Sequence, residues 1–240
     1  TNNLGDSNRS YGNINFDYKF HFLPELRAVV NIGYDNIKAK TINSSSTLVA
    51  TNDDVKGNSS LGFQKRTNEL LDGYLTYNKE FDKFRTEFTA GYSYQRFTNE
   101  GDNTGNKRDP LSFPSTFADP DVVLIGYFGR ANFTLSDKYL VTLTYRRDGT
   151  SRFSEKNRWG DFPAAAVAWN ISDEDFLKDS NVISNLKLRA GYGITGQQDV
   201  GEKDVFLNRY RAGDQNSQYQ FDNVVIQSLI ASEINPDLKW

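Results

Sequence analysis

A glycine-rich stretch near residue 190 has the spacing that comes nearest to a chemical site. Gly191-x-Gly193-x-x-Gly196 matches the dinucleotide fingerprint, in which glycines let the backbone approach phosphates in front of a helix. The residues that follow, Gln197-Gln198-Asp199-Val200-Gly201, do not open a helix. We therefore expect Gly191 and Gly193 to allow close packing of a neighbouring element on one face of a strand.

The titratable residues do not form a catalytic or metal-binding set. His21 is the only histidine and there is no cysteine, which excludes a thiolate metal site and a disulfide framework. The acidic run Asp173-Glu174-Asp175 follows Ser172, a pattern typical of a helix N-cap with acidic residues in the first turn. We expect one or two helical turns there, through Lys178. Because no nucleophile–base pair is visible, we predict a chain that is not an enzyme and binds no cofactor.

The bulk composition limits the partners. The net charge of −3 provides no basic field for nucleic acid. Aromatic residues reach 14% in a chain of mean hydropathy −0.65, which suits strands that are apolar on one side only. No run approaches 18 apolar residues, which excludes a transmembrane helix but not a membrane barrel. The chain starts at Thr1 without Met or a signal peptide, so we expect a piece of a longer protein.

Alternation of apolar and polar residues predicts long β-strands. From Tyr139 to Tyr145 the odd positions are Tyr, Val, Leu and Tyr, and the same period of two returns from Leu186 to Ile194. The expected strands cover about 12–22, 26–34, 70–81, 84–95, 122–135, 139–147, 162–171 and 186–194. Long connections are expected at 36–66, 97–121, 148–161 and 196–236, the last with a small hairpin near Tyr210 and Tyr219. Residues 1–10 are expected to form a loop, and 238–240 to begin a ninth strand.

The order of short and long connections indicates an all-β, antiparallel up-and-down meander of about eight long strands. Tight turns alternate with long connections, as in outer-membrane barrels. A soluble β-sandwich that acts as a carbohydrate-binding module has the same two-faced strands, although sandwiches prefer shorter strands and Greek-key connections. We predict a slice of a transmembrane outer-membrane β-barrel, with residues 1–240 as one partial barrel domain, and keep the sandwich as the alternative.

In a barrel of this kind the apolar face meets lipid and the polar face borders the lumen. Aromatic residues near the strand ends are expected to form two interface girdles: Phe20, Phe22, Phe81, Phe84 and Tyr139 on one rim, and Tyr34, Tyr92, Tyr94, Tyr127 and Tyr145 on the other. Arg96 and Arg147 share the lipid-facing register at the outer strand ends, where they can reach headgroups. The lumen-facing candidates, for structural pairing or for contact with a plug or solute, are Arg130, Asn132, Arg146, Asp148 and Arg189.

Motifs between residues 146 and 240 resemble the SusC/RagA family of TonB-dependent outer-membrane transporters of Bacteroidetes. They are Arg146-x-Asp148-Gly149-x-Ser151-x-Phe153, Trp159-Gly160-x-Phe162-Pro163-Ala164, Trp169-x-Ile171, Glu174-x-Phe176-Leu177, Leu186-Lys187-Leu188-Arg189-x-x-Tyr192-Gly193-x-x-Gly196 and Asn235-Pro236-Asp237-Leu238-Lys239-Trp240. Their order and spacing make the resemblance specific. Residues 1–138 add only a compatible strand pattern.

The resemblance implies a barrel of about 22 strands plugged by an N-terminal domain and located in the cell outer membrane. It further implies a SusD-like surface lipoprotein as partner, and import of a glycan or peptide solute driven by TonB. Relative to that architecture the plug domain, the TonB box and the remaining strands are absent, so TonB would act through the missing N-terminal part. Outer-membrane lipid is the expected surrounding. Tyr210, Tyr219 and Phe221 are candidates to stack on sugar rings, or to pack the loops on one another.

Overall fold

The computed structural model describes residues 2–46, 57–107, 114–177, 182–199, 206–208, 210–212, 218–222, 224–231 and 234–240. Its long strands are β1 (Asn2–Lys19), β2 (Leu26–Ser44), β3 (Ser59–Phe81), β4 (Phe84–Asn103), β6 (Val122–Leu135), β7 (Tyr139–Thr150), β8 (Trp159–Asn170) and β9 (Lys187–Gly193). The short elements are β5 (Ser115–Ala118), η1 (Ile171–Asp173), β10 (Tyr210–Ala212), β11 (Gln218–Phe221), β12 (Val224–Gln227) and β13 (Leu229–Ala231). In these parts of the chain, no helix has the length and apolarity needed to cross a membrane.

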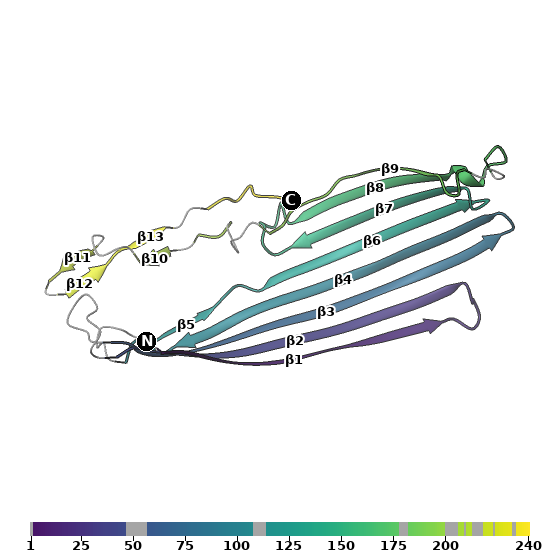
Figure 1. The fold of residues 1–240 in the computed structure, drawn as a ribbon. Coiled ribbons are helices and arrows are strands. Elements are labelled where there is room, and N and C mark those ends of the chain that lie inside the picture. Colours follow the sequence, from purple (N-terminus) through teal and green to yellow (C-terminus); the bar gives the residue numbers. More distant parts are fainter. Residues whose placement is uncertain are drawn as a thin grey trace.

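The long strands form one antiparallel sheet in which each strand pairs with its neighbours along the chain, while β5 pairs with the end of β4 (Figure 1). Short turns join β1 to β2, β3 to β4 and β6 to β7 at one end, here called the turn end. The longer connections after β2, β4 and β7 lie at the opposite end, the loop end (Figure 1). The predicted all-β meander of about eight long strands is therefore confirmed.

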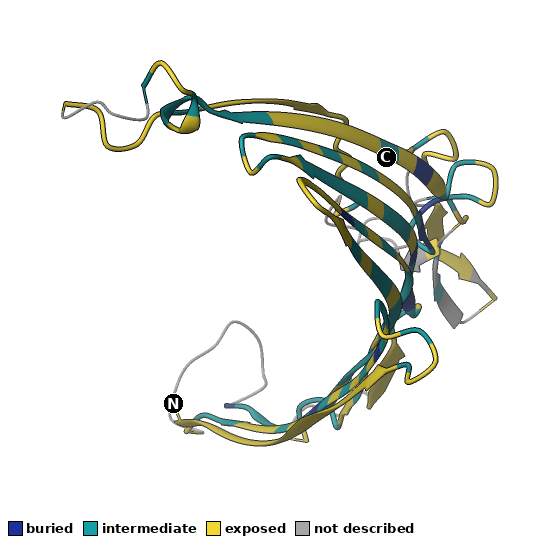
Figure 2. Ribbon diagram, turned by 90° about the vertical axis from the view of Figure 1, so that its right-hand side faces the viewer, coloured by how far each residue is buried: buried dark blue, intermediate teal, exposed yellow. Residues whose placement is uncertain are grey.

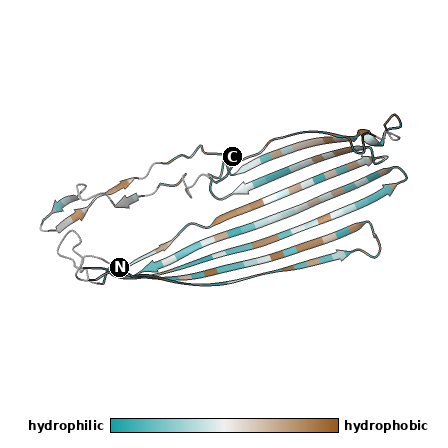
Figure 3. Ribbon diagram, in the orientation of Figure 1, coloured by the Kyte–Doolittle hydropathy of each residue, from teal (hydrophilic) through white to brown (hydrophobic). Residues whose placement is uncertain are grey.

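The sheet is curved (Figure 2), and apolar and polar residues alternate along its strands (Figure 3). In β7 the apolar Val141, Leu143 and Tyr145 are 37%, 48% and 49% exposed, whereas Thr142 and Thr144 between them are half-buried. Side chains spread apart on the convex side of a curved sheet and crowd on its concave side. The apolar face is therefore the convex face, and the polar face is the concave one.

Burial contradicts the β-sandwich alternative. Within the described ranges the buried apolar residues are Val29, Val122 and Phe153, and none of them lies on the convex face. A sandwich packs the apolar face of one sheet against a second sheet. Here the described long strands belong to a single sheet with sequential pairing, so the sandwich prediction is wrong.

The strand register confirms the parity read from the sequence. Successive cross-strand partners on the convex face include Ile32, Leu71, Tyr94 and Ile125. Arg96 lies opposite Glu69 and Val123 on this face, and Arg147 lies opposite Tyr127 and Asp161. Both arginines therefore share the apolar register, as predicted.

Several strand boundaries were predicted too short. Residues 2–11 belong to β1, β2 continues to Ser44, and β3 begins at Ser59, so much of 36–66 is strand. Similarly, β4 continues to Asn103, and β7 and β8 cover 148–150 and 159–161. The extra strand is mostly polar, with scattered apolar residues such as Ile42 and Phe63, and it is held by cross-strand pairs such as Arg9–Asp35 and Lys65–Glu100, both at 2.7 Å. A strand with water on both sides shows no alternation, and this is why it was taken for a connection.

Two predictions near the strand ends also need correction. In place of an α-helix capped by Ser172, there is one 3-10 turn, η1, preceded by Asn170 without a side-chain cap; Lys178 lies outside the described residues. Leu238–Trp240 is not a strand, because Trp240 packs against the β7–β8 loop instead. The hairpin expected near Tyr210 and Tyr219 is present as two small sheets, β10–β13 and β11–β12.

Candidate functional site

The five predicted lumen residues share the concave face of the sheet. Arg130 and Asn132 lie in β6, Arg146 and Asp148 in β7, and Arg189 in β9. The register places Arg130 opposite Thr144, and Arg189 opposite Ala168 at the far edge. They are therefore spread over the concave face from β6 to β9, and they do not converge on one pocket.

Three of the five are bound within the wall itself. Asn132 donates to Glu87 Oε1 at 2.9 Å and accepts from the Thr142 hydroxyl at 2.9 Å. Arg146 Nε donates to Asp148 Oδ1 at 2.7 Å, and its guanidinium lies over the Phe128 ring. These contacts hold β4, β6 and β7 together.

Arg130 and Arg189 differ from those three. In the described parts of the chain, neither guanidinium has a carboxylate within ion-pair distance. Arginine presents five donors in a fixed fork and stays charged, so a concave-face arginine without a carboxylate is suited to an anionic or carbonyl-rich contact from outside the sheet. Of the predicted set, these two are available for a plug or a solute.

A cluster of aromatic rings and glycines closes the concave face at the loop end of β7 and β8. Trp240 packs edge-on against Phe153 and Phe162, with ring centroids 5.9 Å and 5.3 Å away, and its Nε1 donates to Arg158 O at 2.7 Å. A Cβ on Gly160 would lie 2.6 Å from the Phe162 ring and 2.8 Å from Trp240. Only glycine fits there. We call Phe153, Gly160, Phe162, Gly196 and Trp240 the inner corner.

The inner corner also gathers segments that are far apart in sequence. Ser154 and Asn157, in the β7–β8 loop, donate to Pro236 O at 2.9 Å and 3.2 Å. A Cβ on Gly196, beyond β9, would lie 2.5 Å from the Phe162 ring. The motifs that carry the family resemblance therefore meet in space. The motifs were recognisable in the sequence, but this contact was not predicted, because Trp240 was assigned to a strand.

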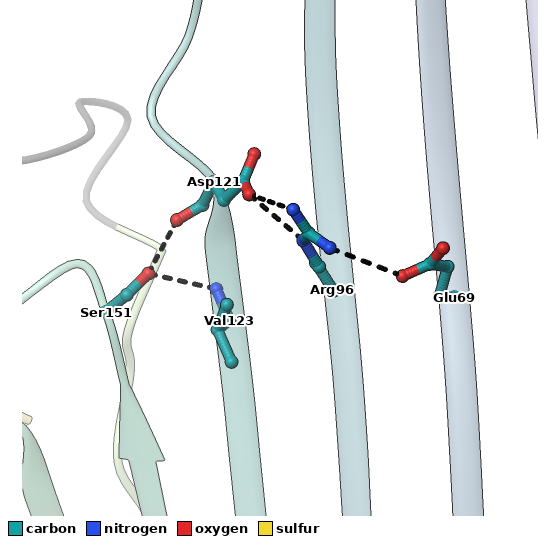
Figure 4. Close-up of polar contacts among 5 residues, drawn as sticks. All are labelled: Glu69, Arg96, Asp121, Val123 and Ser151. Atoms are coloured by element: carbon teal, nitrogen blue, oxygen red, sulfur yellow. Dashed lines mark hydrogen bonds and ion pairs between the residues drawn. The ribbon is translucent and has the colours of Figure 1, made fainter.

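A second polar contact joins three segments on the convex side of the same rim (Figure 4). Arg96 donates through Nη2 to Asp121 Oδ2 at 2.6 Å, and its Nη1 lies 3.9 Å from Glu69 Oε2. The Ser151 hydroxyl donates to Asp121 O and accepts from Val123 N, both at 2.9 Å. The start of β6 is thereby tied to both β4 and the β7–β8 loop, which fixes where two of the longer connections leave the sheet.

A polar hollow lies on the concave face where β2, β3 and β4 extend towards the loop end. It has a volume of about 320 Å³, and the lining side chains on this face are Asp35, Ile37, Arg66, Asn68, Phe97 and Asn99. Arg66 is exposed and has no carboxylate within ion-pair distance in the described chain, and Phe97 offers a ring that is 38% exposed. Sequence reasoning missed this hollow because 36–66 and 97–121 were assigned to connections. The Phe97 ring and Arg66 in a polar run were the available signal.

The glycine fingerprint is a packing feature. Gly191 and Gly193 lie in β9 opposite Ala166 and Ala164, and a Cβ on Gly193 would lie 2.8 Å from the Ala164 Cβ. The prediction of close packing by a neighbouring element is confirmed for Gly193, against β8, whereas a Cβ on Gly191 would make ordinary contact with Ala166 at 3.4 Å. Of the loop aromatics, Tyr210 lies in the β10–β13 sheet, and Tyr219 and Phe221 lie in β11.

The acidic run at the turn end closes the β6–β7 turn onto the β8–β9 connection. Glu174 accepts from the Tyr139 hydroxyl at 2.6 Å, from Trp169 Nε1 at 2.9 Å and from Lys138 Nζ at 3.1 Å. These hydrogen bonds, with Tyr139 contributing most, lower the pKa of Glu174 to about 2. The Glu174 carboxylate is therefore hydrogen-bonded to side chains of β7, β8 and the β6–β7 turn, and it does not lie in the first turn of a helix.

Comparison with known proteins identifies the architecture. Residues 1–240 match the family model described as TonB dependent receptor-like, beta-barrel. The TonB-dependent receptor SusC of Bacteroides thetaiotaomicron is 36% identical over 100% of this chain and 24% of its own length. The TonB-dependent receptor P3 of Formosa agariphila is 33% identical over 94% of this chain and 24% of its own length.

Solved structures agree on the fold. The RagAB peptide transporter matches with a TM-score of 0.80 at 18% identity, over 99% of this chain and 27% of that one. The RagAB peptide importer in its closed-closed state matches with a TM-score of 0.79 at 19% identity, with the same coverage. The chain thus spans about a quarter of the length of these relatives. The relatives are TonB-dependent receptors and a peptide transporter, not enzymes, and this chain belongs to the TonB-dependent receptor β-barrel family.

Proposed function

We propose that this chain is part of the barrel wall of an outer-membrane importer of oligosaccharides, peptides or other large nutrients. TonB drives the import, and a SusD-like surface lipoprotein works with the barrel. The observation that carries the proposal is the exposed apolar convex face, where Val141, Leu143 and Tyr145 have no covering layer in the described chain. In water such a face would aggregate, whereas in a membrane it is the surface that acyl chains cover.

The dimensions of the sheet support a membrane location. A barrel strand needs about 9–11 residues to cross the bilayer, and β7 and β8 have 12 each. Three of the connections at the turn end are tight, and the connections after β2, β4 and β7 lie at the loop end, which is the arrangement of periplasmic turns and extracellular loops. The connection between β8 and β9, residues 171–186, is the longer one at the turn end. On this proposal the inner corner, the Arg96–Asp121 contact and the polar hollow all lie towards the outside of the cell.

The concave face supplies the solute-facing wall. The polar hollow combines the Arg66 guanidinium, which has no carboxylate partner in the described chain, with two amides and the exposed Phe97 ring. These groups suit the carboxylates, hydroxyls and ring faces of glycans or peptides. Arg130 lies on the same face. Tyr210, Tyr219 and Phe221 are candidates for stacking in the last connection. A peptide is one option because the RagAB relative is named a peptide importer.

The proposal is tested in cells that carry the full receptor. Membrane fractionation is expected to place it in the outer membrane, and affinity purification is expected to recover a surface lipoprotein with it. Growth on the transported oligosaccharide or peptide should require the receptor and an intact TonB. A receptor that supports the same growth without TonB, or that fractionates with soluble protein, contradicts the proposal.

A paired substitution tests the wall. Arg66→Ser with Phe97→Ser should slow uptake of the solute several-fold without lowering the amount of receptor in the membrane. The matched control is Lys38→Ser, which changes an exposed cation on the opposite face of β2. Equal uptake by the double variant and the control would remove the hollow from the solute path while leaving the membrane assignment intact.

A further inference from the structure

A hollow on the convex face has an almost wholly apolar lining. It has a volume of about 520 Å³ and lies across β3, β4, β6 and β7. Its floor consists of the small residues Ala90, Gly129 and Ala131, which adjoin one another in β4 and β6. Larger side chains form the sides, among them Leu75, Phe88 and Leu143. The result is a groove in the apolar face, with small residues along its floor.

No neighbouring atom would clash with a Cβ at Gly129, so packing within the sheet does not require glycine there. A Cβ there would meet only Thr89 O, at 3.9 Å, which is ordinary contact. By contrast, a Cβ on Gly91 would lie 2.6 Å from Phe128 and one on Gly126 would lie 2.5 Å from Asp148, so those glycines make room for neighbours on the concave face. Glycine inside a strand weakens it, and it often marks a place where a ligand approaches the backbone. Nothing in the described chain fills the space above Gly129.

The cationic side chain of Arg147 lies beside the groove, on the side towards the loop end of β7. Arg147 follows the lining residue Tyr145 by two positions on the same face of β7, a separation of about 7 Å along the strand. Its guanidinium lies over the Trp159 ring at 5.5 Å, and Nε is 3.9 Å from Asp161 Oδ1. That oxygen already accepts from the Tyr145 hydroxyl at 2.6 Å. The guanidinium therefore keeps donors for an anion at the level of the aromatic rim.

We propose that this groove is a lipid site, in which an acyl chain lies over Gly129 and the phosphate of its headgroup binds Arg147. The inference rests on the proposed function, because it requires the convex face to meet the membrane. An apolar trough that leads up to a cation matches the two parts of an anionic lipid, and arginine suits phosphate by bidentate donation. A partner protein with a flat surface would not fill the groove and would not need an anion beside Arg147. A second copy of the barrel is the competing occupant.

The test uses the full receptor purified from outer membranes in a neutral detergent. Native mass spectrometry measures the lipid retained per receptor, and size-exclusion chromatography with light scattering measures the number of copies. Gly129→Leu fills the trough without a backbone clash, and Arg147→Gln removes the charge. The matched control is Gly73→Leu, since Gly73 is another convex-face glycine with nothing within 4 Å of its Cβ and does not line the groove. If Gly129→Leu is not recovered as a folded barrel, Ala131→Leu replaces it.

We expect each groove variant to lower lipid retention at least threefold, and the control to retain as much as the parent. After delipidation, dimyristoyl phosphatidylglycerol should raise the melting temperature of the parent more than dimyristoyl phosphatidylcholine does. Arg147→Gln should remove that difference. The lipid site is overturned if the parent and Gly129→Leu retain equal amounts of lipid. It is also overturned if Gly129→Leu lowers the number of receptor copies per particle while the retained lipid stays unchanged, because the groove would then bind a second barrel. Absence of the parent from the outer membrane would instead overturn the proposed function.

Discussion

The two halves of the sheet differ in strand length and in the contacts at their loop ends. Strands β1 to β4 have 18, 19, 23 and 20 residues, well beyond what a bilayer crossing requires, whereas β6, β7 and β8 have 14, 12 and 12. The long half continues past the apolar band as a mostly polar extension, joined by pairs such as Arg9–Asp35. The short half ends at the inner corner, where rings and glycines interlock.

This difference explains where sequence identity can vary. In the extensions of the long half a position needs only a side chain that pairs with water or a cross-strand partner, and many residue types do that. In the inner corner the requirement is steric, because a Cβ on Gly160 or Gly196 would lie within 2.6 Å of the Phe162 ring. The recognisable motifs lie in the short half for that reason. Four substitutions test the contrast, in order of expected effect.

Trp240→Ala should have the largest effect. It removes ring contacts with Phe153 and Phe162 and the hydrogen bond to Arg158 O. Loss of a well-packed Trp costs about 3 kcal/mol or more. Hydrogen exchange in the full receptor should show faster exchange of the amides at the loop ends of β7 and β8, with β2 and β3 unchanged. Uniform exchange across both halves would show that the corner is not a separate unit.

Gly160→Ala tests the steric requirement directly. The added methyl group must displace Phe162 or Trp240, and overpacking of this kind costs about 1–3 kcal/mol. The melting temperature of the purified receptor should fall. Gly73→Ala is the control in the long half, where the new Cβ has no neighbour within 4 Å. If both variants melt alike, the two halves do not differ in packing as described.

Glu174→Gln tests the turn end of the short half through pH. The pKa of Glu174 is lowered from about 4.5 to about 2, so its stabilising contribution is complete above pH 4.5 and is lost as the pH falls through 2. The variant should melt at a lower temperature at pH 7 and lose less stability than the parent between pH 4.5 and 2. Asp175→Asn is the control, because that carboxylate is 99% exposed and 3.9 Å from Lys138. Parallel melting curves for parent and Glu174→Gln would show that the hydrogen bonds do not matter.

The same contrast explains how much of the structure was readable from sequence. Alternation fixed the faces of β2, β4, β6 and β7, since a one-residue slip would move every apolar side chain to the other side. It failed for residues 2–11, 36–44 and 59–66, where polar residues predominate on both faces and the few apolar residues give only a weak period. Lumen residues were placed on the correct face, but their bonding was not, because hydrogen bonds such as Asn132 to Glu87 depend on register between strands. The contact of Trp240 with Phe153 spans a separation that no local pattern encodes.

Lys65→Ser should have the smallest effect on the melting temperature. It tests whether an exposed ion pair stabilises the extension of the long half. Lys65 Nζ lies 2.7 Å from Glu100 Oε1, with the two side chains 47% and 53% exposed, so water and salt screen the pair. The backbone ladder between β3 and β4 continues through this position, which keeps the extension paired without the lysine. We expect a melting temperature within error of the parent, at low and at high salt alike. A drop as large as that of Gly160→Ala would mean that the polar extension is held by specific charges, and the contrast between the two halves would fail.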